Sequence, residues 1–146
     1  MKARAYSYSL VTLQFMLITA LLIQHGLQLP SMMSLLLFCS GCGFGLYTMQ
    51  DNTLGNFNIS PEIKDNALLI TTGAYRHIRH PMYFSVLLMM LGVVASRFNL
   101  LSLLLYLLLI LTLLLKAKRE EKLWVRHSNA YSSYRQKTKR IIPFIL

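Results

Sequence analysis

Long runs of apolar residues alternate with short polar breaks along most of this chain. No charged residue occurs between Arg4 and Asp51, and a break at residues 25–30, which contains a glycine and a proline, divides that stretch into segments 6–23 and 31–49. Each segment is close to the ~20 residues that a helix needs to cross the hydrocarbon core of a bilayer. Glycine and proline favour a turn between them. The pattern therefore predicts two membrane-spanning helices joined as a hairpin.

A second pair of apolar segments follows at residues 82–96 and 100–115, separated by a short polar turn. Both are shorter than the usual ~20 residues, so we expect flanking residues to extend them or the membrane to be thin there. The last helix should continue out of the bilayer through residues 116–124, which places Lys116 and Glu120 on one face. The expected fold class is all-α: an integral membrane protein with about four transmembrane helices arranged as two hairpins.

Composition supports a membrane protein with a single domain. A chain of 146 residues has little room for a second folded domain, so residues 1–146 form one unit, with the first hairpin in 1–50 and the chemistry in 51–146. The chain is 55% hydrophobic and 14% charged, with a mean hydropathy of +0.48. These values are too apolar for a soluble globular domain and indicate an integral membrane protein.

The distribution of basic residues predicts the orientation in the membrane. Only Arg97 lies between the third and fourth apolar segments, whereas every other Lys and Arg precedes the first segment, separates the second from the third, or follows the fourth. By the positive-inside rule, the face with the excess is cytoplasmic, so we expect a multi-pass protein with both termini in the cytoplasm. Topology and attraction to membrane lipids account for the net charge of +10, and we expect no nucleic acid as a partner.

The two cytoplasmic segments, residues 50–80 and 116–146, hold all five acidic residues and most of the available chemistry. Four basic or imidazole side chains crowd the end of the first segment, directly before an apolar run: Arg76, His77, Arg79 and His80. Pro81 is well placed as the first residue of the third helix, where free backbone N–H groups could hold an anion. The alternative interpretation is a basic anchor for lipid headgroups at the membrane interface.

Two patterns in the second apolar segment have structural interpretations. Cys39 and Cys42 lie within the predicted helix and have no second pair of ligands, so we expect no metal site. Gly41 and Gly45 are four residues apart with no preceding strand, which fits a helix-packing groove better than a dinucleotide-binding loop. Such a groove packs either within one chain or between two, so a homo-oligomer stays open.

Several short motifs follow one another in order through the second part of the chain: Gly55–Asn58, Leu69–Tyr75, Arg79–Tyr83, Arg119–Glu121, Tyr131–Tyr134 and Ile142–Pro143. This ordered set resembles the integral membrane methyltransferases of the isoprenylcysteine carboxyl methyltransferase family, which are themselves similar to phospholipid methyltransferases. The resemblance covers roughly residues 51–144. The first two apolar segments match only as generic helices.

The resemblance implies binding of S-adenosyl-L-methionine in a cytoplasmic pocket built from the linker and the tail. The methyl acceptor would be a lipophilic small molecule or lipidated group that enters from the membrane, such as an isoprenylcysteine carboxylate or a lipid amine. By similarity, the cofactor pocket would be lined by Ala67, Leu68, Leu69, Ile70, Tyr75, His80, Pro81, Met82 and Tyr83. No metal is implied.

The charged residues receive roles by the same resemblance. Glu120 or Glu121 would bind a polar part of the cofactor, and the motifs leave open which of them does so. Lys116 stands where the family places an arginine that faces the acceptor, although an ammonium cannot reproduce the bidentate guanidinium fork. Arg79 or His80, with the amides at the start of the third helix, would meet the cofactor's carboxylate. Lys116 and Arg79 are therefore the candidate catalytic residues.

Two other functions stay open on the sequence. One is an NADPH-dependent membrane reductase related to the sterol reductases, whose C-terminal arrangement is similar. The other is a non-enzymatic scaffold that binds lipids. The motifs do not define the acceptor, and His80 and Glu121 are both candidates for a general base, which an ammonium acceptor would need and a carboxylate would not.

Overall fold

The computed structural model describes residues 2–26, 29–51 and 67–142, and helices dominate them. The elements are α1 (Lys2–His25), α2 (Met32–Asp51), the 3-10 turn η1 (Gly73–Arg76), α3 (Pro81–Ser96), α4 (Leu100–His127) and α5 (Ala130–Lys137). Within these ranges, α1, α2 and α4 are long and apolar enough to cross a membrane, and α3 is a shorter apolar helix. The all-α membrane fold is confirmed. The Gly55–Asn58 motif and Pro143 lie outside the described residues.

Local sequence signals explain where the helices begin and end. Gly26, with a φ of 65°, follows the last residue of α1 and supplies the left-handed conformation that L side chains avoid. Pro81 opens α3 because its fixed φ suits the first helical turn and its missing N–H is not needed there. α4 starts with a capping box in which Asn99 accepts from the Ser102 amide at 2.9 Å and Ser102 Oγ accepts from the Asn99 amide at 3.0 Å. The turns therefore fall where the sequence predicted them.

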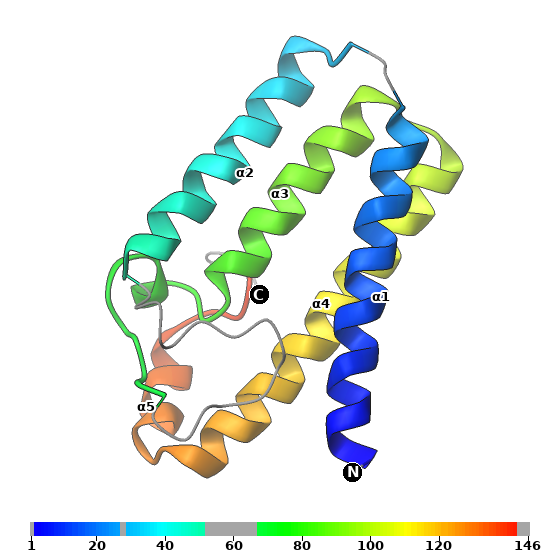
Figure 1. Ribbon diagram of the computed structural model, residues 1–146. Helices are drawn as coiled ribbons and strands as arrows, with labels where there is room; N and C mark the ends of the chain where they lie inside the picture. Colours follow the sequence, from blue (N-terminus) through cyan, green and yellow to red (C-terminus); the bar gives the residue numbers. More distant parts are fainter. Residues whose placement is uncertain (1, 27–28, 52–66, 143–146) are drawn as a thin grey trace.

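The helices run alternately up and down, so the α1–α2 and α3–α4 turns share one end of the bundle (Figure 1). The other end holds the start of α1, the extended last part of α4, and α5. As expected, α4 continues without a break for 28 residues, well past its apolar part. The partners in the bundle are less obvious: α2 packs mainly on α3, while α1 packs on α4 and α3. A short turn joins α1 to α2 as predicted, but these two helices make little contact with each other.

Small residues let α2 and α3 approach closely. A Cβ atom added at Gly41 would lie 2.6 Å from Met89 Cγ and 2.7 Å from Met89 N, and one added at Gly45 would lie 2.6 Å from Ser85 Oγ. The Ser85 hydroxyl donates to the Gly41 carbonyl at 2.8 Å, a hydrogen bond across the interface. The predicted glycine groove therefore exists, and in this structure it is filled by α3 of the same chain.

The buried face of α1 repeats every three or four residues, which is the spacing of a helix packed along a seam: Ser7, Leu10, Gln14, Leu17 and Leu21. Leu17 and Leu21 join a core with residues of α3 and α4, and Ile141 from the C-terminal tail belongs to the same core at 1% exposure. Many other leucines point outward, as expected for surfaces that face lipid.

Candidate functional site

Polar side chains from two separate stretches of the chain meet where α3 begins. They come from the segment before α3, from α3 itself and from the part of α4 that extends past the apolar core: Tyr75, Arg79, His80, Tyr83, Lys116, Glu120 and Glu121. This meeting point lies in the half of the bundle that also holds α5 and the start of α1 (Figure 1). We call these seven residues the polar cluster.

His80, Tyr83 and Glu120 form the centre of the polar cluster. The His80 ring stacks on the Tyr83 ring with centroids 5.3 Å apart and planes within 5°, and its Nδ1 lies 3.2 Å from Glu120 Oε2. The Tyr83 hydroxyl donates to Glu120 Oε1. Burial works to lower the pKa of His80, but the adjacent carboxylates of Glu120 and Glu121 outweigh it, so the pKa lies above its usual range. The two carboxylates therefore favour the protonated form of the imidazole.

Glu121 lies deeper than Glu120 and is surrounded by cations. Its side chain is 3% exposed, and it accepts from Arg79 Nε at 2.9 Å and from two nitrogens of Arg140 at 3.0 and 3.1 Å. His80 Nε2 is 3.5 Å away, an ionic contact without hydrogen-bond geometry. A buried carboxylate with two guanidinium partners joins the elements that carry them, so Glu121 connects α4 to the start of α3 and to the tail.

The C-terminal tail lies alongside the segment before α3 and uses its backbone groups. The amide of Arg79 donates to the Lys139 carbonyl at 2.8 Å, and that of His80 donates to the Arg140 carbonyl at 2.9 Å. The Tyr83 amide donates to His80 O at 3.1 Å within the first turn of α3. The amides of Arg79, His80 and Tyr83 therefore already have partners within the chain. The expectation that an anion is held at the start of α3 stays a prediction.

The side chain of Arg79 also faces the tail. Besides Glu121, its guanidinium donates to the carbonyl of Thr138 and to that of Arg135, the latter at 3.1 Å. In the structure these contacts join Arg79 to α4 and to the tail. The part in the cofactor site or the reaction that the sequence suggested for Arg79 stays a prediction.

Tyr75 is supported by α5 and lies near the carboxylate of Glu120. Its carbonyl accepts from the Tyr134 hydroxyl at 2.6 Å, so α5 supports it. Burial, with the charges of Glu120 and Asp51, raises the pKa of Tyr75 to about 12, and its hydroxyl stays protonated at neutral pH. Asp51, at the end of α2, also lies directly against Gly73, whose φ of +52° favours glycine. Sequence analysis missed this role for Asp51.

Lys116 is almost fully buried at 2% exposure. Its Nζ lies 5.1 Å from the centroid of the Tyr83 ring and donates to Gln14 Oε1 of α1 at 2.6 Å. Sequence analysis did not single out Gln14. The available signal was that it is the only amide side chain between Arg4 and Ile23 in a segment otherwise suited to lipid, since polar side chains inside a membrane span mark functional positions.

The other residues expected to line the cofactor pocket differ in their burial. Pro81 is buried and Met82 half-buried at the start of α3. Residues 67–70 form a non-helical segment before η1, in which Leu68 is 70% exposed and the other three are half-buried. Their part in a cofactor pocket therefore stays a prediction.

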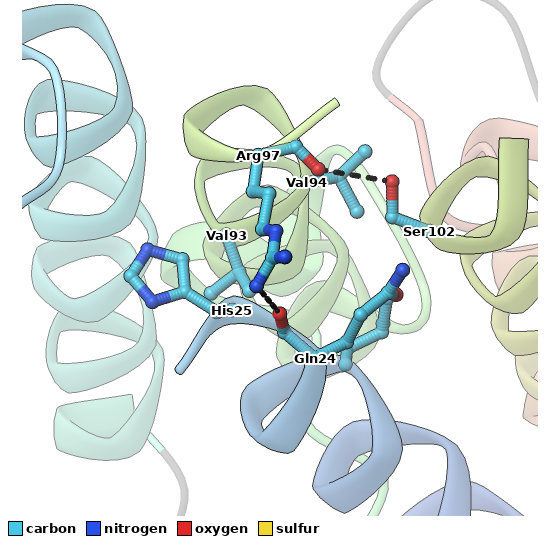
Figure 2. Close-up of a pocket in the computed structure, with 7 residues that line it drawn as sticks. Gln24, His25, Val93, Val94, Arg97 and Ser102 are labelled. Carbon is cyan, nitrogen blue, oxygen red and sulfur yellow. Dashed lines mark hydrogen bonds between the residues drawn. The ribbon is translucent and has the colours of Figure 1, made fainter. Parts of the chain in front are cut away.

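A small hollow at the opposite end of the bundle has a structural explanation (Figure 2). It is lined by Leu21, Gln24, His25, Val93, Val94, Arg97 and Ser102. Arg97 donates to the Gln24 carbonyl at 2.7 Å, and Ser102 Oγ donates to the Arg97 carbonyl at 3.2 Å. Gln24 Nε2 also donates to Asn99 Oδ1 at 2.8 Å. These bonds join the ends of α1, α3 and α4, far along the bundle from the polar cluster.

Cys39 is exposed, while Cys42 Sγ lies 3.4 Å from Met89 Sδ at the α2–α3 interface. Among the described residues, no group of three or more His, Cys, Asp or Glu side chains could hold a metal ion.

The all-α bundle, with three helices long and apolar enough to cross a membrane among the described residues, defines an integral membrane protein. The model of one family, phospholipid methyltransferase, matches residues 29–132, and the chain belongs to this family. The protein is thus a membrane methyltransferase, and the resemblance found in the sequence is confirmed. No curated protein matches the chain. The family match covers α2 to α4 but begins after α1, the helix that carries Gln14.

Proposed function

We propose that this protein transfers a methyl group from S-adenosyl-L-methionine to a lipophilic acceptor at the membrane surface. The observation that carries the proposal is the contact of His80 and Tyr83 with Glu120, inside the region that matches the phospholipid methyltransferase family. An acidic and aromatic centre suits a cationic cofactor, and its position beside the apolar core suits an acceptor with a lipid tail.

The side chains of the polar cluster suit S-adenosylmethionine. S-adenosylmethionine carries a sulfonium and an ammonium cation together with ribose hydroxyls, and it supplies an activated methyl group when bound. The Glu120 side chain is 20% exposed and bonded to a neutral phenol and an imidazole, whereas Glu121 is 3% exposed and satisfied by guanidinium groups. This difference supports Glu120 as the cofactor contact. The rings of Tyr75 and Tyr83 would offer faces to the sulfonium.

The work left to the protein is positioning. Holding the nucleophile, the methyl carbon and the sulfur in line supplies much of the acceleration of a displacement and requires no covalent enzyme intermediate. His80 is held by Glu120 on one side and by the tail on the other, through its amide bond to Arg140 O at 2.9 Å. Arg79 is a positioning residue that locks this geometry through Glu121. Lys116, buried beside Tyr83, would face the acceptor.

The orientation in the membrane is part of the proposal. The bundle end that carries the polar cluster also carries exposed cations on α4, α5 and the residues after α5: Lys118, Lys122, Arg126, Arg135, Lys137 and Lys139. A concentration of Lys and Arg favours the cytoplasmic face, where anionic lipid headgroups attract it. Both termini and the site would then be cytoplasmic, and the acceptor would enter from the inner leaflet.

The first test is calorimetric titration of the protein in an uncharged detergent with S-adenosylhomocysteine, using NADPH as the comparison ligand. We expect saturable binding of S-adenosylhomocysteine, weakened about tenfold or more in Glu120→Gln and in Tyr83→Phe, since each removes a charged or polar partner. Tyr106→Phe is the matched control, because it also loses a partly buried phenol hydrogen bond, to Leu87 O at 3.0 Å, but away from the polar cluster. Binding of NADPH alone would move the protein to a reductase activity, and binding of neither ligand by folded protein would favour a scaffold.

A further inference from the structure

Gln14 belongs to α1, outside the family match, yet its side chain reaches the polar cluster. It is 7% exposed, and its Oε1 accepts from Lys116 Nζ at 2.6 Å. Lys116 Nζ is in turn 5.1 Å from the ring of Tyr83, whose hydroxyl donates to Glu120. A single chain of contacts therefore runs from the middle of α1 to the proposed cofactor contact.

A buried amide side chain at position 14 lowers the stability of the fold compared with an apolar side chain. The neighbouring seam positions on α1 are Leu10, Leu17 and Leu21, all buried, and a leucine at position 14 would bury more apolar surface at lower cost. Polar side chains within membrane spans are rare, and they commonly mark sites rather than packing. Packing of α1 against α4 therefore does not explain why residue 14 is a glutamine.

The hydrogen bonds of Gln14 are only partly used. An amide side chain has an acceptor oxygen and two N–H donors, and the oxygen is taken by Lys116. Within the described part of the chain, no residue accepts from Gln14 Nε2, although the side chain is more than nine-tenths buried. Two N–H donors of Gln14 thus lie beside the Lys116 ammonium, and none of the described residues accepts from them.

We propose that Gln14 and Lys116 together form a binding corner for an anionic oxygen of the acceptor, a phosphate or a carboxylate; this rests on the proposed methyl transfer to a lipophilic acceptor. Gln14 Oε1 orients the ammonium, and Gln14 Nε2 donates to the acceptor oxygen beside it. A lysine alone is a point charge that cannot bind two oxygens in a fixed plane. The adjacent amide supplies the second, directional donor, so the pair reproduces two-point recognition.

The test compares three single-chain amphiphiles that share an eighteen-carbon oleyl-type tail: oleoyl lysophosphatidic acid, oleate and oleyl alcohol. We expect the wild-type protein in uncharged detergent to bind at least one of the two anionic probes about tenfold more tightly than the alcohol. In Gln14→Leu this preference should fall about fivefold or more, while affinity for the alcohol stays the same. The reason is that the variant lacks the amide donor, and this loss weakens only the ligands that hydrogen-bond to it. Preference for the phosphate probe would point to a phospholipid acceptor, and preference for the carboxylate probe to a lipidated carboxylate; both support the corner.

Two further variants keep the test decisive if Gln14→Leu folds poorly. Gln14→Glu retains an oxygen for Lys116 but has no N–H donors, so it should also lose the anionic preference. Thr12→Val changes an exposed polar residue of the same helix and should have no effect. An anionic preference unchanged in Gln14→Glu, or absent from the wild type, overturns the corner.

Titration of the same wild-type preparation with S-adenosylhomocysteine separates the two proposals. If the wild type binds this ligand but Gln14 has no influence on the amphiphiles, only the corner is wrong. If the wild type does not bind it, the proposed function fails, and a Gln14-dependent anionic preference would still establish the corner as a lipid-binding site.

Discussion

Neighbouring residues in the polar cluster have identical chemistry and different surroundings. Glu120 and Glu121 are adjacent on α4, but the first bonds to Tyr83 and His80 at a partly open position and the second is enclosed by Arg79 and Arg140. A buried ion pair adds little net stability compared with apolar packing, yet removal of one partner leaves an uncompensated buried charge. The two carboxylates should therefore differ in what their loss affects.

Glu121→Gln should destabilise the fold by about 3–5 kcal/mol, because Arg79 and Arg140 would lose the carboxylate they share. Glu120→Gln should leave thermal stability nearly unchanged and weaken binding of S-adenosylhomocysteine. Thermal unfolding in detergent, followed by circular dichroism, and calorimetry on the same samples measure the two effects. Equal loss of stability in both variants would contradict the distinction.

His80 should make stability depend on pH. Its pKa is raised in the fold above the ~6.5 of an unperturbed histidine, so above that pH the folded protein binds more protons than the unfolded chain. The contribution is complete below pH ~6.5 and is lost as the pH rises through the folded pKa. The melting temperature of the wild type should therefore fall from pH 6 to pH 9 more steeply than that of His80→Gln. Parallel profiles would show that the imidazole does not act in this way.

At the scale of the elements, the α2–α3 interface depends on backbone approach. Ser85 and Met89 of α3 occupy the space in which side chains at Gly41 and Gly45 would stand. Gly43, between them in sequence, points away from α3, and nothing lies within 4 Å of a Cβ built there. One helix thus contains glycines that packing requires and one that it does not.

Gly41→Ala should destabilise the protein by about 1–3 kcal/mol, because the new methyl group meets the backbone nitrogen of Met89 and an atom of backbone cannot turn away. Gly43→Ala is the matched control and should be neutral or slightly stabilising, since alanine favours helix by up to ~1 kcal/mol over glycine. Thermal unfolding of both variants in the same detergent measures the contrast. A stable Gly41→Ala protein would mean that α2 and α3 pack less closely than the structure shows.

The whole molecule places its polar cluster and most of its described exposed cations at one end, and the α1–α2 and α3–α4 turns, with the exposed Arg97, at the other. Figure 1 shows these two turns at the same end of the bundle. The α1–α2 turn contains Leu29, which is 94% exposed, and α5 contains the exposed Ser133. In a background with Cys39 and Cys42 changed to serine, Leu29→Cys and Ser133→Cys should react with a membrane-impermeant maleimide from opposite sides. We expect the first to be labelled in intact cells and the second only after permeabilisation. Labelling of both from the same side would contradict the antiparallel bundle.

Much of the architecture was predictable because it depends on local chemistry. A charge-free segment must satisfy its backbone within a helix to stay in lipid, so the apolar runs located α1, α2 and α4. Pro81 at the start of α3 and Gly26 after α1 also set the helix ends through their own backbone geometry. The Arg79–Tyr83 and Arg119–Glu121 motifs identified most of the polar cluster through their resemblance to a family.

What stayed hidden in the sequence depends on contacts between distant residues. Gln14 and Lys116 are 102 positions apart in the chain, and the local sequence around either residue does not indicate their contact. The backbone of Arg140 reaches His80 only because the tail folds back, which also buries Ile141. Ile141 is part of the core that residues of α1, α3 and α4 also form.

The sequence by itself determined that this is a helical membrane protein, where its four apolar helices lie to within a few residues, and which polar side chains are available to a site. It did not predict α5. Tertiary structure alone decided that α2 pairs with α3 rather than with α1, that Glu121 is a buried anchor while Glu120 is accessible, and that α1 contributes Gln14. The physical reason is that hydropathy and turn preferences act over a few residues, while burial and hydrogen-bond partners are set by whichever helix packs alongside.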